Sequence, residues 1–132
     1  MKVIVCGGRF NNLTERDKKY LLSKVDNGTI TELVCGMAHG IDVQSYNLLK
    51  GKIPINEYPA LWDDLTALPC LIKYNKYGKP YNALAGSNRN LLMAQNAEGI
   101  IAFPGGTGTE NMVKQAKKIG ITIIDNFMEV LY

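Results

Sequence analysis

The hydrophobic positions of this chain fall into five short apolar runs, separated by longer segments of mixed polarity. The runs predict strands buried on both faces, as in a parallel sheet, over residues 2–6, 31–35, 53–58, 99–103 and 121–124. The segments between them predict helices over residues 14–26, 41–50, 87–96 and 109–119. Thr14 suits the N-cap of the first helix, because Glu15 and Asp17 follow in its first turn.

Strands that alternate with helices indicate an α/β fold with right-handed crossovers between parallel strands. We therefore predict a Rossmann-like three-layer sandwich whose five-stranded parallel sheet has the order 3-2-1-4-5. This order places the first and fourth strands side by side, with their following helices on opposite faces. The loops that leave these two strands should flank a crevice at the carboxyl ends, where open α/β sheets bind their ligands.

Length and composition exclude several classes of protein. The 132 residues suffice for one domain, and 46% hydrophobic and 20% charged residues are ordinary for a globular chain. The net charge of +3 is too slight to indicate nucleic-acid binding by itself. No apolar run approaches a membrane span and no signal-peptide pattern opens the chain, so we expect a cytoplasmic protein.

The three cysteines lack the spacing of a metal site, and their number is odd. Cys6 and Cys35 both end predicted strands, which favours small core residues in a reducing compartment. A nucleophilic Cys6 is the alternative, although His39 is the one histidine that could activate it.

A long insertion, the predicted flap at about residues 60–86, separates the third strand from the third helix and has no clear periodicity. Aromatic and basic residues interleave within it: Trp62, Lys73, Tyr74, Lys76, Tyr77, Lys79 and Tyr81. One interpretation is a surface excursion whose aromatic rings pack on the body. The other is a flap that stacks a ring on a nucleotide base and places lysines near phosphates.

Glycine-rich loops follow three of the predicted strands, and the most informative is Pro104–Thr109. Gly105, Gly106 and Gly108 let the backbone approach a ligand, and the helix that follows presents unpaired N–H groups to an anion. The other two loops are Gly7-Gly8-Arg9 and the segment Gly36–Asp42. Each alone is compatible with an ordinary strand-to-helix turn. Three together indicate ligand-binding loops on one rim of a parallel sheet.

These motifs and their order resemble the SLOG superfamily, which includes DNA-processing protein A and the LONELY GUY phosphoribohydrolases. The nearest likeness is to its small proteins of phages and bacteria, so the compartment would be the host cytoplasm for a phage-encoded chain. The matching residues cover nearly the whole sequence: Gly7-Gly8-Arg9, Gly36–Asp42, Tyr58-Pro59-Ala60-Leu61-Trp62, Gly78-Lys79, Ala85–Asn90 and Phe103–Thr109. The resemblance implies a nucleotide or nucleotide-derived ligand at the carboxyl rim.

The sequence departs from the phosphoribohydrolases where their catalytic glutamate stands. Met112 takes that place, while Arg89 occupies the position of their arginine. Glycosidic cleavage needs a carboxylate near the anomeric carbon, and the candidates are Glu110 and Asp42. His39 stands where Arg is common and could bind phosphate, act as a base or simply face solvent.

Our leading hypothesis is a protein that binds a nucleotide or an ADP-ribose-like molecule, as a sensor or a sequestering agent. The alternatives are an N-glycosidase acting on nucleoside monophosphates and, less favoured, a protein that binds single-stranded nucleic acid. We expect no metal and no cofactor, and a homodimer or a higher homo-oligomer is possible. The apolar tail at residues 127–132 could pack on a partner or on the core of its own chain. The predicted ligand-binding residues are Gly7, Gly8, Arg9, Gly36, His39, Asp42, Ser87, Arg89, Asn90, Gly105, Gly106, Thr107, Gly108 and Thr109.

Overall fold

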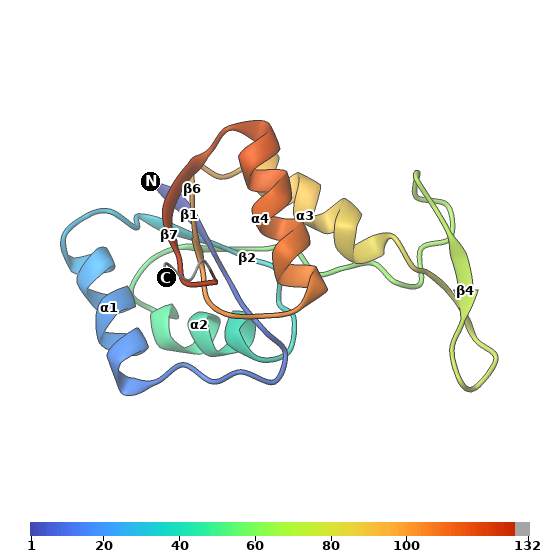
Figure 1. Cartoon of the computed structure of the whole chain (residues 1–132), viewed down its shortest axis with the longest axis horizontal. Coiled ribbons are helices and arrows are strands. Elements are labelled where there is room, and N and C mark those ends of the chain that lie inside the picture. The colour runs from blue at the N-terminus through green and yellow to red at the C-terminus, as the bar shows by residue number, and fades with distance from the viewer. Residues whose placement is uncertain (129–132) are drawn as a thin grey trace.

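The computed structural model describes residues 1–128, in which five strands form a parallel sheet with helices on both faces (Figure 1). The sheet order is β3-β2-β1-β6-β7, which is the predicted 3-2-1-4-5 when a separate hairpin is left out. Its strands are β1 (Lys2–Cys6), β2 (Glu32–Cys35), β3 (Ile55–Glu57), β6 (Gly99–Ala102) and β7 (Thr122–Asn126). The helices are α1 (Glu15–Asp26), α2 (Ile41–Leu49), α3 (Ala85–Gln95) and α4 (Thr107–Ile119). The predicted fold class is confirmed.

Each face of the sheet has its own hydrophobic core, because side chains along a strand alternate between faces. Val3 and Val5 of β1 pack with the buried side chains of α1 and α2. Ile4 lies on the opposite face, in a core shared with α3 and α4. The central strand is therefore held between two helical layers, and its carboxyl end is fixed in position.

The ends of the helices follow the capping signals in the sequence. Thr14 caps α1 as predicted: its hydroxyl accepts from the N–H of Asp17 at 3.1 Å, and the Asp17 carboxylate accepts from the N–H of Thr14 at 3.0 Å. α4 ends at Gly120, which has the left-handed φ of 91°. Both α3 and α4 begin two residues before their predicted starts, since small residues assigned to loops are already helical. Within residues 1–128, no helix is long and apolar enough to cross a membrane.

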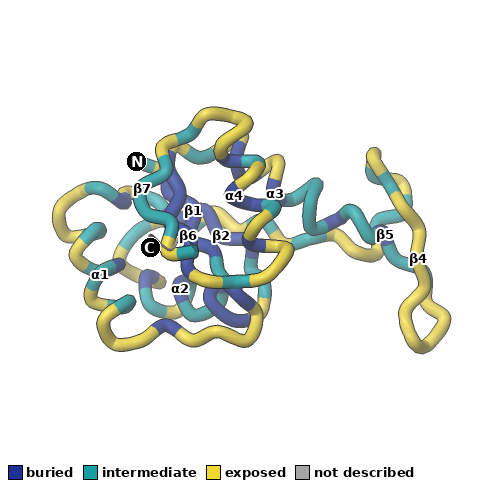
Figure 2. Tube along the Cα trace, viewed as in Figure 1, coloured by how far each residue is buried: buried dark blue, intermediate teal, exposed yellow. Residues whose placement is uncertain are grey.

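The segment that joins β3 to α3 projects from the body, and we call its residues 60–84 the arm (Figure 1). Two short strands, β4 (Ile72–Tyr74) and β5 (Pro80–Asn82), pair as an antiparallel hairpin within it. The sequence analysis found no clear periodicity in the flap at about residues 60–86 and missed this hairpin, because three-residue strands carry too little periodicity to detect. Figure 2 shows that most of the arm is exposed, and Tyr74 and Tyr77 keep 69% and 82% of their surface accessible.

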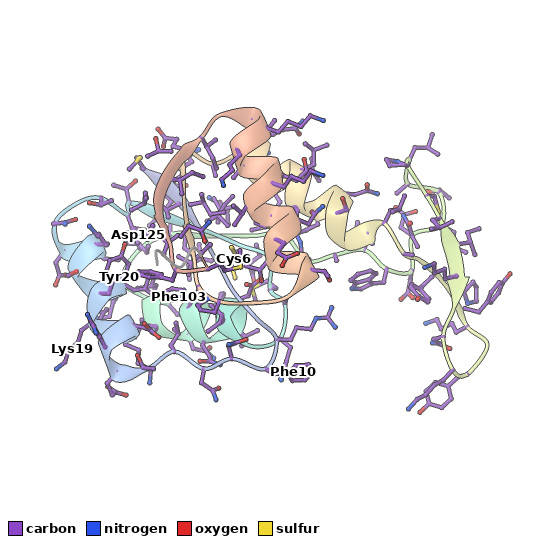
Figure 3. The ribbon with its side chains drawn as sticks, viewed as in Figure 1. Cys6, Phe10, Lys19, Tyr20, Phe103 and Asp125 are labelled. Carbon is purple, nitrogen blue, oxygen red and sulfur yellow. The ribbon has the colours of Figure 1, made fainter. Side chains whose placement is uncertain are left out.

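The described part of the C-terminal tail packs on the body of the same chain. Phe127 stacks on Phe103 with ring centroids 5.2 Å apart and meets Tyr20 edge-on at 5.5 Å. The Tyr20 hydroxyl donates to the Asp125 carboxylate and thereby ties α1 to the end of β7 (Figure 3). Residues 129–132 of the predicted apolar tail lie outside the described residues.

Candidate functional site

A cleft of about 640 Å³ opens at the carboxyl end of the sheet, beside the adjacent strands β1 and β6. The loop after β1, the start of α2, the base of the arm, α3 and the start of α4 all line it. Small-molecule sites typically measure roughly 300–1,000 Å³. The cleft therefore lies at the predicted rim and has room for a nucleotide.

Most of the predicted binding residues line this cleft. They are Gly7, Gly8, Arg9, Asp42, Ser87, Arg89, Asn90, Gly106, Thr107, Gly108 and Thr109. The others, Gly36, His39 and Gly105, do not line it. His39 is exposed in the loop after β2. Gly36 and Gly105 each lie so close to neighbouring residues that a side chain there would collide with them.

The first turn of α4 presents free backbone donors to the cleft. Gly106 is the N-cap residue and offers no side-chain cap, and the first helical hydrogen bond runs from the N–H of Glu110 to the carbonyl of Gly106 at 3.0 Å. Among residues 1–128, no hydrogen-bond acceptor meets the N–H groups of Gly106, Thr107, Gly108 or Thr109. A helix N-terminus with unsatisfied donors and a favourable dipole attracts anions. This turn is suited to hold a phosphate.

Close contact between two loops fixes this turn against β1. The N–H of Gly8 donates to the carbonyl of Pro104 at 2.9 Å. A Cβ at Gly105 would lie 2.7 Å from the backbone nitrogen of Gly8 and would collide with the hydroxyl of Thr109. A glycine at position 105 is therefore required for the close approach of the two loops. The sequence alone did not indicate this packing role, because the neighbours of Gly105 come from another loop, and its role as a ligand contact stays a prediction.

The loop after β2 is joined to the same rim through a second glycine. Gly40 has φ of 90°, and a Cβ there would collide with the backbone carbonyl oxygen of Gly8. The next residue, Ile41, donates its N–H to that same carbonyl at 3.3 Å. The three glycine-rich loops thus meet at one place, as predicted from the order of the strands.

Arg89 lies in the second turn of α3 and spans the cleft toward the loop after β2. Its Nη1 donates to the carbonyl of Gly36 at 2.5 Å and to that of Tyr58 at 3.3 Å, and its Nε donates to Asn90 Oδ1 at 2.9 Å. Arg89 therefore links α3 to the loops after β2 and β3, and its Nη2 is left without an acceptor among the described residues.

Asn90 extends this network to α4. It is buried, and its Nδ2 donates to Asn111 Oδ1 at 3.0 Å and to the carbonyl of Gly108 at 3.4 Å. Because Asn90 also accepts from Arg89, the guanidinium and the first turn of α4 share a partner. These bonds let Asn90 position the residues around it, and its role as a ligand contact stays a prediction.

Asp42 is the one carboxylate among the lining residues of the described cleft. Only 7% of its surface is exposed, and its Oδ2 accepts from the N–H of Ala38 at 3.3 Å. Burial raises the pKa of Asp42 to about 6, against smaller lowering effects of the Ala38 N–H and the Arg89 guanidinium. A Cβ at Gly36 would lie 2.9 Å from both Asp42 Oδ2 and Arg89 Nη1, so this glycine lets the two charged groups approach.

Glu110, the other predicted catalytic carboxylate, is exposed on α4 and does not line the cleft. Met112, at the place of the phosphoribohydrolase glutamate, does line it and is 2% exposed. Cys6 also lines the cleft at the end of β1 (Figure 3). Burial raises the pKa of the Cys6 thiol above its ordinary value, which disfavours the thiolate needed for nucleophilic attack.

Some lining residues escaped the sequence analysis. Phe10 follows the Gly-Gly-Arg motif, lines the mouth of the cleft and is 94% exposed (Figure 3). The sequence could have indicated Phe10, because a large apolar residue there belongs to no predicted strand or helix. Trp62 belongs to the Tyr58–Trp62 motif and to the flap but was not among the predicted binding residues, and the structure places it on the cleft wall.

The residues at the cleft suit an anion and hydroxyl groups better than a metal ion. Within residues 1–128, no group of three His, Cys, Asp or Glu side chains gathers in a way that could hold a metal. Comparison of the chain with protein-family models, curated proteins and solved structures finds no match.

Proposed function

We propose that this chain binds a nucleotide at the carboxyl rim of its sheet, as a sensor or a sequestering protein of the SLOG type. The observation that carries the proposal is the run of free N–H groups from Gly106 to Thr109 at the wall of a cleft of about 640 Å³. These groups would hold the phosphate, with the exposed guanidinium of Arg9 nearby.

The remaining polar groups suit the sugar of such a ligand. Asp42 can accept hydrogen bonds from ribose hydroxyls, as acidic residues do in other dinucleotide-binding sheets. The free Nη2 of Arg89 can donate to a phosphate or sugar oxygen. One anion-binding turn and one carboxylate in a single cleft match the phosphate and the ribose of a nucleoside monophosphate.

Binding is favoured over glycosidic cleavage by the arrangement of carboxylates. Met112 brings a thioether to the place of the family glutamate, and Glu110 lies outside the lining of the cleft. The observation in favour of catalysis is Asp42, whose pKa of about 6 suits proton transfer near neutral pH. Cleavage at Asp42 is therefore the second candidate function.

A nucleotide screen separates the two candidates. The protein is incubated with AMP, GMP, CMP and UMP, the shift in its melting temperature is recorded, and released base is measured by chromatography. A ligand at a hundred times its dissociation constant should stabilise the protein by about 2.7 kcal/mol. Stabilisation without released base supports binding, and base released by wild type but not by Asp42→Asn supports the glycosidase. Neither stabilisation nor base release would contradict both.

A further inference from the structure

A second pocket, which we call the outer pocket, lies beside the cleft and has a volume of about 380 Å³. Arg9, from the loop after β1, forms its wall on the body. The arm supplies the rest: Trp62, Asp63, Asn75, Lys79, Pro80 and Tyr81. The exposed segment therefore forms a pocket together with the body, in addition to projecting into solvent (Figure 1).

The outer pocket and the cleft are neighbours because they share two lining residues. Arg9 and Trp62 border both of them. Arg9 is exposed, and Trp62 keeps 38% of its surface accessible. A ligand that passes from the cleft to the outer pocket would therefore meet a guanidinium and an indole at the junction.

The outer pocket has the chemistry of a base-binding site. The rings of Trp62 and Tyr81 lie 6.4 Å apart at an interplanar angle of 69°, so two aromatic side chains contribute to its walls. Aromatic rings stack on nucleotide bases with little dependence on base identity. Lys79 contributes a cation, whose Nζ lies 3.4 Å from Asp63 Oδ1.

A buried asparagine holds the arm segments that form this pocket. The N–H of Asn82 donates to the carbonyl of Trp62 at 2.7 Å. Its Oδ1 accepts from the N–H groups of Leu71 and Leu84 at 3.2 and 3.0 Å. Asn82 is fully buried and follows Tyr81 directly, so the two aromatic residues are held together by backbone contacts.

We infer that the ligand is a dinucleotide: two nucleosides joined through phosphate, one in the cleft and the second with its base in the outer pocket. This inference rests on the proposed function and extends it. The linking phosphate would lie between the first turn of α4 and Arg9, and the second base would stack on Trp62 or Tyr81. A mononucleotide would leave the outer pocket empty.

The test compares the affinities of AMP, diadenosine pyrophosphate, the 3′–5′ linked dinucleotide ApA and a single-stranded ten-residue oligoadenylate, by titration calorimetry. We expect wild type to bind one of the two dinucleotides about tenfold more tightly than AMP, because one more base is stacked. The preferred linkage distinguishes a free pyrophosphate-linked molecule from the end of a cleaved nucleic acid. An oligoadenylate that binds far more tightly than both dinucleotides would overturn the inference in favour of a polynucleotide.

Two variants of the arm locate the second base. Tyr81→Leu should remove most of the tenfold margin while AMP affinity stays within about twofold of wild type. Tyr74→Leu is the matched control, since Tyr74 lies on the same hairpin but lines neither pocket. Lys79→Glu is a second variant, for the case in which Tyr81→Leu does not fold. It leaves both aromatic rings in place and should also weaken dinucleotide binding more than AMP binding, because Lys79 lines the outer pocket.

The outcomes separate this inference from the proposed function. Equal affinities for AMP and both dinucleotides, or a margin that survives both Tyr81→Leu and Lys79→Glu, would refute the dinucleotide while nucleotide binding stands. Failure of wild type to bind any of the four probes would refute both.

Discussion

Asp42→Asn should make the folded protein more stable at neutral pH while weakening its ligand binding. The carboxylate is 7% exposed and no ion pair within 4.0 Å neutralises it among residues 1–128. Its nearest counter-charge, Arg89, directs Nη1 to two backbone carbonyls instead. An asparagine keeps the size of the side chain and an oxygen that accepts from the Ala38 N–H, but it carries no charge to desolvate.

The magnitude follows from the shift in proton affinity. Folding raises the pKa of Asp42 from 3.8 to about 6, and each pKa unit corresponds to about 1.4 kcal/mol. The ionised carboxylate therefore destabilises the folded state by about 3 kcal/mol above pH 6. The folded state binds the proton more tightly than the unfolded state, so this destabilisation declines as pH falls from 6 to 4 and is absent below pH 3.8.

Urea denaturation at pH 7.5, 5 and 4 measures this difference in the free energy of unfolding. We expect Asp42→Asn to exceed wild type by about 3 kcal/mol at pH 7.5, by less at pH 5 and by little at pH 4. Asp26→Asn, on an exposed position of α1, is the control and should change stability by less than about 0.5 kcal/mol at every pH. A variant less stable than wild type at pH 7.5 would refute the reasoning, because it would mean that the charge of Asp42 is compensated.

Three further outcomes test the packing of the site. Gly105→Ala should lower the free energy of unfolding, measured in urea, by about 1–3 kcal/mol, because the new Cβ would lie 2.7 Å from the backbone nitrogen of Gly8. Gly108→Ala is the control and should not lower it, because its Cβ would have no neighbour within 4 Å among the described residues. Arg89→Lys should lower stability by about 1–3 kcal/mol and loosen the cleft, since one ammonium cannot replace both Nη1, which donates to two carbonyls, and Nε, which donates to Asn90. Unchanged urea midpoints would contradict this. Iodoacetamide at pH 8 should modify the partly exposed Cys70 of the folded protein and spare the buried Cys6. Mass spectrometry of digested samples measures both, and rapid modification of Cys6 would indicate an activated cysteine instead.

The position of the site could be predicted from the sequence because it depends on strand order alone. Parallel strands end at the same rim, so the loops at Gly7–Arg9, Gly36–Asp42 and Pro104–Thr109 had to lie near one another. Their contacts through Gly8 agree with that prediction.

The roles of individual residues needed the three-dimensional structure. Arg89 was predicted only as a ligand contact, because the carbonyl of Gly36 to which it donates lies 53 residues away along the chain. Whether Glu110 faces the cleft depends on the rotation of α4, which is set by the burial of Met112 and its neighbours in the core. The strands of the hairpin in the arm are too short for their pattern to be recognised. The outer pocket could not be predicted either, because Arg9 is far along the chain from the arm residues that line it.

The most direct test of nucleotide binding is a ¹⁵N–¹H correlation spectrum of the protein titrated with AMP. We expect the largest shifts at the amides of Gly106, Thr107, Gly108 and Thr109, which have no acceptor among residues 1–128 and would donate to the phosphate. Adenosine, which lacks the phosphate, should leave these amides nearly unchanged at the same concentration. Equal shifts with adenosine, or AMP shifts confined to residues outside the first turn of α4, would contradict a phosphate site at this helix.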